Sequence, residues 1–465
     1  MTPAEALALL RHAEADGAPS LAERRALLER LRAAVLSRAQ VLADAAAADF
    51  GARAPEDTLL ADVLLVADAA RFSRRRLHRW ARRRRVPVPF PFWPARAWTE
   101  CVPKGVVGIM APWNYPVQLA LAPAVDAIAA GNRVVIKPSE TAPRIAALLA
   151  EIVAEALGPR LGLVVQGGPD VARDFAAQPW DHLVFTGGTE TGRKVMAAAA
   201  PHLTPLTLEL GGKCPALILP GADLASAARH VLAGKAVNAG QTCIAPDTVL
   251  LIGHDAAGFA AACRASGIAG SETAVINAAQ RARLARLAEG VAVTPLAAQA
   301  AAMPRGAQAT ALPPGPGATS TPLALAAARD ALAAEEIFGP LLAVRECADL
   351  AEALAWIGAR PHPLAIYLFG ATRAEEEAVA AGSKSGAIVT GRTLEYAAVP
   401  GLAFGGVGAS GFGRRNGEAG FREFSSIRAR MRHGRWSLSR LFDPPRGAFA
   451  RRLARRLVGL GDAPS

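Results

Sequence analysis

The stretch His182–Val195 has the sequence HLVFTGGTETGRKV, and the prediction of the fold starts from it. An apolar, strand-forming run ends at Thr186 and is followed by Gly187 and Gly188, and a helix is expected over 192–200. A strand, a glycine turn and a helix in this order let backbone N–H groups and a helix N-terminus approach a pyrophosphate. On this fragment alone, a glycine turn with no ligand explains the pattern equally well, because the spacing is not G-x-G-x-x-G.

Outward from this stretch, short β-rich runs alternate with helical patterns, which predicts a parallel, doubly wound sheet of the α/β class. The elements expected before it are strand 105–110, helix 117–130, strand 133–137, helix 143–157 and strand 163–166. A second α/β unit is expected from Leu210 onward, with strands at 216–219, 248–252 and 364–369 and a helix at 224–237.

Other parts of the chain lie outside this alternation. A capping box at Ser20 precedes apolar residues at helical spacing, so one amphipathic helix is expected over 21–50 and another over about 62–79. The first residues are typical of a helix rather than of a signal peptide. The segment 290–321 is rich in Ala, Pro and Gly and is expected to be irregular surface structure.

The charge of the chain is unevenly distributed. The sequence has 52 Lys plus Arg and 40 Asp plus Glu, a net charge of +12. Segment 74–85 holds eight arginines and segment 428–465 holds ten arginines and two aspartates, so the rest of the chain nets −4. The body therefore does not favour nucleic acid as a partner, and no apolar run suits a membrane span. The five scattered cysteines form neither a disulfide framework nor a metal cluster, which favours a cytoplasmic protein without a metal site.

Three side chains are candidates for chemistry, and each has an ordinary structural alternative. Cys243 lies in the loop NAGQTC, where a thiolate would be a nucleophile, although a lone cysteine is more often a small buried apolar residue. Glu209 lies in an apolar β-rich run, where a desolvated carboxylate suits a general base, unless it faces water at an edge strand. Asn114 lies in the stiff turn APWNYP and can donate to an oxyanion, unless it serves only the turn.

Two charged residues near the end of the strand expected at 133–137 are candidates for a nucleotide site. Lys137 ends that strand and is one of only six lysines in the chain. Glu140 follows and can accept hydrogen bonds from a ribose diol. The alternative is an exposed lysine and a glutamate that stabilises a helix start.

The joint order of six motifs is far more specific than any one of them. The motifs are APWNYP, IKPSE, FTGGTETG, LELGGK, NAGQTC and EEIFGP. In this order they resemble the aldehyde dehydrogenase superfamily, and the resemblance runs from about residue 5 to residue 430. The contexts HLTPLTLELGGKCP and GQTCIAPD look like the class 3 branch, which includes fatty aldehyde and bacterial coniferyl aldehyde dehydrogenases.

The resemblance implies a catalytic role for each of the three candidates. Cys243 would attack the aldehyde carbonyl to give a thiohemiacetal, and Asn114 with the backbone N–H of Cys243 would stabilise the oxyanion. Hydride transfer to the nicotinamide would leave a thioester, and Glu209 would activate the water that hydrolyses it to a carboxylic acid. The branch as a whole leads us to expect an apolar tunnel for aromatic or medium-to-long aliphatic aldehydes.

The same resemblance implies a binding site for NAD, although the branch often accepts NADP as well. NAD is the expected cofactor because Glu140 would repel the 2′-phosphate of NADP. The implied contacts, in order from the adenosine ribose through the pyrophosphate to the nicotinamide, are Lys137, Glu140, Gly187, Gly188, Gly192, Glu336 and Phe338.

The resemblance also implies the aldehyde dehydrogenase fold, with a Rossmann-like cofactor domain, an α/β catalytic domain and a small bridging or oligomerisation element of a homodimer. The cofactor domain is expected at 1–82 and 103–209, the catalytic domain at 210–400, and the bridging segments and basic tail at 83–102 and 401–465. Some residues depart from the family pattern. Gly188 stands in the phosphate loop where Ser or Asn is frequent, and three others leave the shape of the substrate entrance open: Thr390, Ala403 and Asn416.

Alternatives remain open at this point. A CoA-acylating relative would pass the thioester to coenzyme A, but such relatives generally lack a glutamate at the position of Glu209. A catalytically weak homologue is a second alternative. In the tail, Phe449, Leu453 and Leu457 share one helical face, which is typical of a helix in weak peripheral contact with a membrane, or of one packed on a partner subunit.

Overall fold

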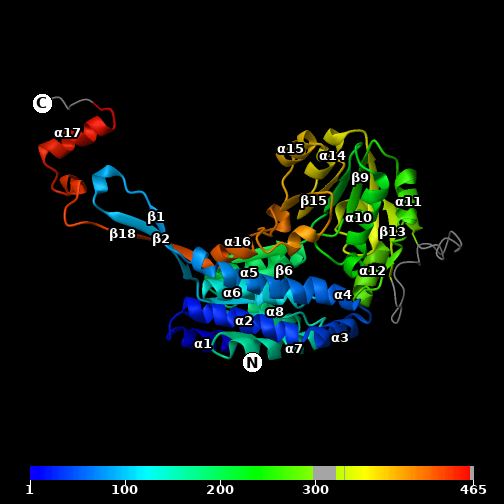
Figure 1. Cartoon of the computed structure of the whole chain (residues 1–465), viewed down its shortest axis with the longest axis horizontal. Helices are drawn as coiled ribbons and strands as arrows, with labels where there is room; N and C mark the ends of the chain where they lie inside the picture. The colour runs from blue at the N-terminus through cyan, green and yellow to red at the C-terminus, as the bar shows by residue number, and fades with distance from the viewer. Residues whose placement is uncertain (297–320, 329, 461–465) are drawn as a thin grey trace.

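The computed structural model describes residues 1–296, 321–328 and 330–460. Figure 1 shows two α/β units beside each other and a thin arm that leaves the first unit and ends near the C-terminus. The main sheets of both units consist largely of parallel strands, which confirms the predicted α/β class. Most of the segment 290–321 lies outside the described residues.

The sheet of the first unit comprises β3 (Val106–Met110), β4 (Arg133–Lys137), β5 (Gly162–Val164), β6 (His182–Gly187), β7 (Leu206–Leu210) and β17 (Gly411–Phe412). Their order across the sheet is β17-β7-β6-β3-β4-β5. Strands β3 to β7 are parallel, and β17 pairs antiparallel with β7. After β3 the chain adds β4 and β5 on one side of the sheet, and it then adds β6 and β7 on the other side. The strand order therefore reverses between β3 and β6. Doubly wound sheets bind ligands at such a reversal, outside the carboxyl ends of the strands.

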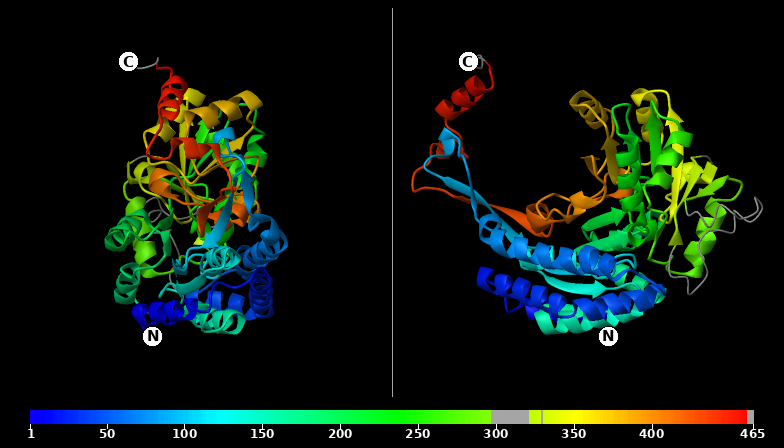
Figure 2. Two further views of the ribbon diagram at one scale, coloured as in Figure 1. Left: turned by 90° about the vertical axis from the view of Figure 1, so that its left-hand side faces the viewer. Right: turned by 45° about the vertical axis from the view of Figure 1, so that its right-hand side comes forward.

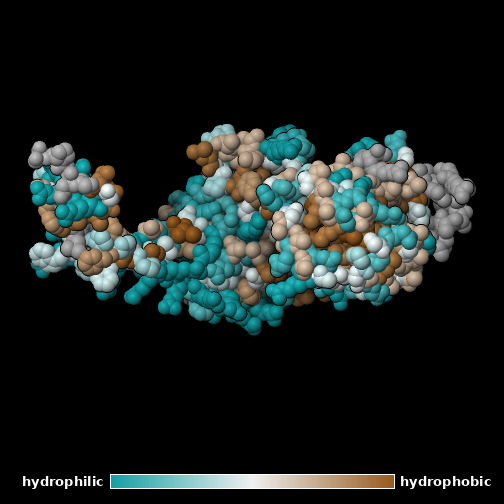
Figure 3. Space-filling view, turned by 90° about the horizontal axis from the view of Figure 1, so that it is seen from above, coloured by the Kyte–Doolittle hydropathy of each residue, from teal (hydrophilic) through white to brown (hydrophobic). Residues whose placement is uncertain are grey.

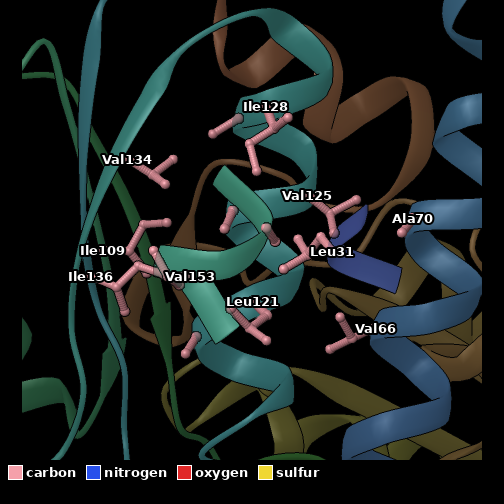
Figure 4. Packing of buried hydrophobic residues seen from close by; sticks show 14 of the residues in the cluster. Leu31, Val66, Ala70, Ile109, Leu121, Val125, Ile128, Val134, Ile136 and Val153 are labelled. Carbon is pink, nitrogen blue, oxygen red and sulfur yellow. The ribbon is translucent and has the colours of Figure 1, made fainter. Parts of the chain in front are cut away.

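Helices cover both faces of this sheet because its side chains alternate. Val107 and Ile109 of β3 belong to one apolar core, and Val106 and Met110 belong to another. Figure 4 shows the first of these cores between the strands and the helices that cover them. The helices on this side are α2 (Leu21–Ser37), α5 (Leu64–Trp80), α6 (Gln118–Ala130) and α7 (Pro143–Leu157). Those on the other side are α1 (Pro3–Glu14), α8 (Pro169–Ala176) and α9 (Thr189–Ala199).

The single helix expected over 21–50 is wrong, because the chain forms α2 and then α3 (Ala39–Phe50). At Arg38 the backbone leaves the helical region, with φ −107° and ψ 14°. Both helices still pack on α7, so the apolar spacing continues across the break. The helix expected over about 62–79 is α5, which a π-helical turn at Leu59–Val63 precedes.

The second unit contains a sheet of seven strands in the order β11-β13-β14-β9-β8-β15-β16. All neighbours are parallel except the edge strand β11. The strands are β8 (Pro215–Ile218), β9 (Thr248–Ile252), β11 (Val293–Pro295), β13 (Ala324–Ala327), β14 (Leu341–Cys347), β15 (Ala365–Phe369) and β16 (Ala387–Thr390). The helices around it include α10 (Leu224–Ala236), α11 (Ala256–Ala265), α14 (Leu350–Gly358) and α15 (Arg373–Gly382).

The arm is an antiparallel sheet of β1 (Arg84–Val86), β2 (Arg96–Pro103) and β18 (Ser425–Arg432), followed by α17 (Ala448–Leu457). Figure 2 shows it standing away from both units, and Figure 3 shows polar and apolar side chains mixed on its surface. Within the segment 401–465, β17 and α16 (Gly417–Glu423) pack on the first unit, and the arm begins only at β18. None of the described helices is both long and apolar enough to cross a membrane.

Candidate active site

Four strands of the first sheet, β3, β4, β6 and β7, run in the same direction, so their carboxyl ends lie along one edge of the sheet. The turn APWNYP follows β3, Lys137 ends β4, Gly187 ends β6, and Glu209 lies next to the end of β7. The structure therefore brings these predicted residues to the edge where the strand order reverses.

The glycine turn after β6 leads directly into α9. Gly188 is the N-cap residue, and no side chain caps this 11-residue helix. A Cβ added at Gly188 would meet no atom within 4 Å, so the uncapped N–H groups and the open space beside them fit a phosphate. Gly192 lies further into the helix, where a Cβ would approach Leu210 Cδ2 to 2.7 Å. This glycine lets α9 pack closely on β7.

Lys137 and Glu140 form an ion pair after β4. The distance from Lys137 Nζ to Glu140 Oε2 is 2.5 Å, and the side chains are 5% and 45% exposed. An ammonium group and a carboxylate side by side can donate to and accept from the hydroxyl groups of a ribose. With the open N-terminus of α9, this pair fits a dinucleotide lying along the edge of the sheet.

Cys243 follows a tightly turned segment of the second unit, η4 (Val237–Gly240). The residues 238–240 have φ angles between 51° and 72°. At Gly240 a side chain is excluded, because a Cβ would lie 2.2 Å from the carbonyl oxygen of Gly339. The loop that carries the thiol is thus fixed by backbone contacts.

Asn114 lies against this loop. Its Nδ2 donates to the carbonyl oxygen of Gln241 at 3.0 Å, which uses one of the two N–H donors of the amide. The hydroxyl groups of Tyr115 and Thr242 are hydrogen-bonded at 2.6 Å. These two bonds join the turn APWNYP to the segment that ends in Cys243.

The surroundings of Cys243 favour its thiol form. Burial raises the pKa of this thiol to about 12, and the carboxyl groups of Glu336 and Glu209 act in the same direction. Arg415 lowers this pKa and so opposes them. The predicted nucleophile is therefore not a preformed thiolate at neutral pH, and it needs a base as it reacts.

Glu209 is buried, but it is not isolated. Arg415 Nε donates to its Oε1, and the side chains of Glu209 and Arg415 are 4% and 1% exposed. Thr186 Oγ1 donates to Oε2 at 3.3 Å. Arg415 follows β17, whose Gly411 pairs with Glu209 across the sheet. Arg415 was not among the predicted site residues, because GFGRRNG gives no sign of which arginine turns inward.

Glu336 reaches the site from the second unit. Burial raises the pKa of its carboxyl to about 8, with Asp247 acting in the same direction. The carboxyl lies against the backbone after β7, so that a Cβ added at Gly211 would overlap Glu336 Oε2. The edge of the first sheet and the segment 335–338 therefore meet beside Cys243.

Two buried charged residues that sequence analysis missed hold this segment. Lys213 pairs with Asp247 and donates from Nζ to the carbonyl oxygen of Glu335 at 3.0 Å. Asp247 Oδ2 accepts from the backbone N–H of Ile337 at 2.7 Å. Lys213 stands in the motif LELGGK and is one of six lysines in the chain, which was the available signal.

Phe338 of the second unit contacts Trp113 of the first unit. It has a φ of 47°, and its ring stands edge-on to Trp113 with the centroids 5.5 Å apart. Trp113 belongs to APWNYP, so the last predicted cofactor residue lies beside the turn that carries Asn114. Among the described residues, no group of three or more His, Cys, Asp or Glu could hold a metal ion.

A cavity of about 290 Å³ opens beside Cys243. Arg415 and Asn416 are among the polar residues at its wall. Its apolar lining includes Leu60, Leu65, Leu119, Ile244, Leu394 and Phe404.

The three departures that concern the substrate entrance occupy different surroundings. Thr390, at the end of β16, and Ala403 are exposed and do not line the cavity. Asn416 does line it, and its backbone N–H donates to Asp126 Oδ2 at 3.0 Å.

The fold and the site together fit an oxidoreductase that binds a nicotinamide dinucleotide. The profile of the "Aldehyde dehydrogenase family" matches residues 8–429, and the chain belongs to this family of NAD(P)-dependent enzymes. A "Probable coniferyl aldehyde dehydrogenase" of Pseudomonas aeruginosa is 36% identical over 449 residues, covering 94% of this chain and 92% of the relative.

Two further comparisons agree with this assignment. The "Aldehyde dehydrogenase family 3 member A2" of Rattus norvegicus is 34% identical and covers 71% of this chain and 68% of the relative. The predicted class 3 branch is thereby confirmed. The structure "Substrate bound state of Staphylococcus Aureus AldH" has a TM-score of 0.83 at 28% identity, covering 92% of this chain and 93% of that chain.

Proposed function

We propose that this aldehyde dehydrogenase converts its substrate to a carboxylic acid through a thioester on Cys243, which a water activated by Glu209 hydrolyses. The observation that carries this proposal is the electrostatic contact between the Cys243 thiol and the buried carboxyl of Glu209 beside an apolar cavity. A buried carboxylate at such a place is a candidate for chemistry, because it loses hydration that packing alone does not restore.

In the first step, Sγ of Cys243 bonds to the carbonyl carbon, and the carbonyl oxygen becomes the oxyanion of a thiohemiacetal. The second N–H of Asn114 and the backbone N–H of Cys243 are the donors for this oxygen. Loss of one such donor typically lowers the rate by about 10²–10³. The thiol proton passes to solvent water as the C–S bond forms, because the pKa of Cys243 is raised to about 12.

The cofactor site fits NAD, which supplies the acceptor for the aldehyde hydride when it is bound. Lys137 and Glu140 would hold the adenosine ribose, and the N–H groups at Gly188 would face the pyrophosphate. Glu336 and Phe338 would hold the nicotinamide end. NAD is proposed over NADP because the carboxylate of Glu140 repels a 2′-phosphate.

In the second step, water attacks the thioester carbon while Glu209 accepts one of its protons. The C–S bond then breaks, and Sγ of Cys243 leaves with the electron pair of that bond. The product is a carboxylic acid, and the proton on Glu209 must depart before the next turnover. A positioned general base of this kind contributes about 10²–10⁴ in rate.

The cavity supports a proposal about the substrate class. Its lining beside Cys243 is mainly apolar, and its volume of about 290 Å³ suits an aromatic ring or a medium-length alkyl chain. We therefore propose aromatic and medium-to-long aliphatic aldehydes as substrates.

The test is NADH formation with benzaldehyde and with hexanal in the absence of coenzyme A. We expect turnover by the unaltered protein and none by Cys243→Ala. A strict requirement for coenzyme A would contradict the hydrolytic reaction and support an acylating one. Turnover that is unchanged in Cys243→Ala would contradict the assignment of the nucleophile.

The arm supports a proposal about assembly. We propose a homodimer formed through β1, β2 and β18, whose side chains Val86, Ile427 and Met431 are exposed in the single chain. Light scattering at several concentrations tests this, and a monomer throughout would contradict it.

The helix α17 supports a second, weaker contact, with a membrane surface. Phe449 and Leu457 are exposed, and the described part of this helix carries arginines but no acidic residue. Peripheral binding to anionic vesicles is the proposed outcome. Equal recovery in the supernatant after sedimentation, with and without residues 436–465, would contradict it.

A further inference from the structure

The base of the proposed reaction has a cationic partner that comes from the far end of the chain. Arg415 Nε bonds to Glu209 Oε1 although the two residues are 206 positions apart, and both side chains are almost fully buried. A buried ion pair seldom adds much stability, because desolvation of both groups offsets their attraction. An ion pair at this place therefore calls for an explanation in terms of the reaction.

The guanidinium of Arg415 is fixed and only partly satisfied. The backbone of Arg415 bonds in both directions to Phe404, at 2.8 and 3.0 Å, and the guanidinium lies over the Phe404 ring at 5.9 Å from its centroid. Nε is engaged by Glu209, whereas Nη1 is buried and has no hydrogen-bond partner among the described residues. Arg415 also lines the cavity beside Cys243.

The other titratable groups that face Glu209 carry no positive charge. Asp126 on α6, Cys243 on the nucleophile loop and Tyr396 on η7 (Glu395–Ala398) each interact electrostatically with it. All three are neutral or negative. Among these neighbours Arg415 is the cation, and it interacts with Asp126 as well.

We propose that Arg415 is a positioning residue for deacylation: it holds the carboxyl group of Glu209 at the cavity wall next to Cys243. The guanidinium binds Oε1 of Glu209. This leaves Oε2, which accepts from Thr186 Oγ1 at 3.3 Å, as the oxygen for the proton of the attacking water. This inference rests on the proposed function, since it assigns a partner to the proposed base.

The experiment compares Arg415→Met with Arg414→Met. The neighbour Arg414 donates to the carbonyl oxygens of Gly406 and Gly413 at 2.6 and 2.8 Å and has no carboxylate partner in the described structure, so it is the matched control. Three quantities are measured: the pre-steady-state burst of NADH, kcat from pH 5.5 to 9.5, and NADH binding by fluorescence. Arg415→Lys keeps the charge and serves as the rescue variant.

We expect Arg415→Met to retain a burst close to one NADH per active site while kcat at pH 7 falls about tenfold or more. NADH binding should stay unchanged, because the carboxyl that loses its partner is that of Glu209 and not a cofactor residue. Arg415→Lys should restore most of kcat, and Arg414→Met should change neither the burst nor kcat. Should Arg415→Met fail to fold, Arg415→Gln replaces it, since it removes the charge and keeps a donor.

Two outcomes would overturn the inference. One is an uncharged variant of Arg415 with an unchanged kcat. The other is a folded, NADH-binding variant that loses the burst together with the steady state, which would place Arg415 before deacylation. Failure of the proposed function is distinguishable, because the unaltered protein would then show neither NADH formation nor a dependence on Glu209.

Discussion

Glu209 and Glu336 face the same thiol from two different units of the molecule, and their surroundings are opposite. Glu209 is bound by the guanidinium of Arg415 and by Thr186. Glu336 has no ion-pair partner among the described residues, and burial raises the pKa of its carboxyl to about 8. The two carboxyls therefore differ in their partner, because a guanidinium pairs with Glu209 and none pairs with Glu336 among the described residues.

The largest effect should come from Glu209→Gln. We expect this variant to keep a burst of NADH and to lose steady-state turnover by about 10²-fold or more, because the amide cannot accept a proton from water. Stopped-flow absorbance followed by steady-state assay measures both phases. If the burst disappears along with turnover, Glu209 acts before the thioester forms.

The next effect concerns the thiol that both carboxyls face. The pKa of Cys243 is raised to about 12, so its thiolate fraction should grow about tenfold per pH unit below that value. Inactivation of the cofactor-free protein by iodoacetamide should therefore accelerate steadily from pH 7 to pH 9. Cys243→Ala provides the alkylation background from the other cysteines. A plateau beginning near pH 8 would show that the thiol is not desolvated as the structure indicates.

A smaller effect should follow from Gly211→Ala. The added Cβ would overlap the carboxyl of Glu336, which must then move away from the backbone after β7. We expect KM for NAD to rise about threefold to tenfold, which corresponds to about 0.7–1.4 kcal/mol of lost binding. The control is Gly358→Ala, where a Cβ meets no atom within 4 Å. Equal KM values for both variants would show that the position of Glu336 does not matter for the cofactor.

The smallest effect at neutral pH should come from Glu336→Gln. Because the pKa of Glu336 is raised to about 8, its carboxyl is mostly neutral at pH 7, and an amide has nearly the same shape and charge. We expect kcat/KM for NAD within about threefold of the unaltered protein at pH 7, with a difference that widens above pH 8 as the carboxyl ionises. A large loss at pH 6 would mean that the carboxylate form is needed.

The sequence was informative wherever function depends on a local motif. The positions of Lys137, Gly188 and Asn114 follow from strand ends and turns, which are short-range features of the chain. Because parallel strands have their carboxyl ends on the same side of a sheet, residues at these ends lie close together in space. This is why the residues at the carboxyl ends of the first sheet's strands could be predicted in some detail.

The sequence was less informative wherever a contact spans distant segments. The ion pair of Arg415 with Glu209 depends on the register of β17 against β7, which no local pattern specifies. The Lys213–Asp247 pair depends in the same way on how the segment 335–338 folds back. The break at Arg38 was hidden because α2 and α3 pack on the same helix, so the apolar spacing does not change there.

The short strand β17 also has a consequence for biosynthesis. During translation β7 leaves the ribosome long before β17. The outer side of β7, which later pairs with β17, therefore stays unpaired while the entire second unit is made. An open strand edge invites pairing with other chains, and here it also carries a buried carboxylate that still lacks its cation. A nascent chain that stops before residue 411 is therefore prone to associate and cannot form the ion pair of Arg415 with Glu209. The outer side of β7 is covered and this ion pair forms in the same late event.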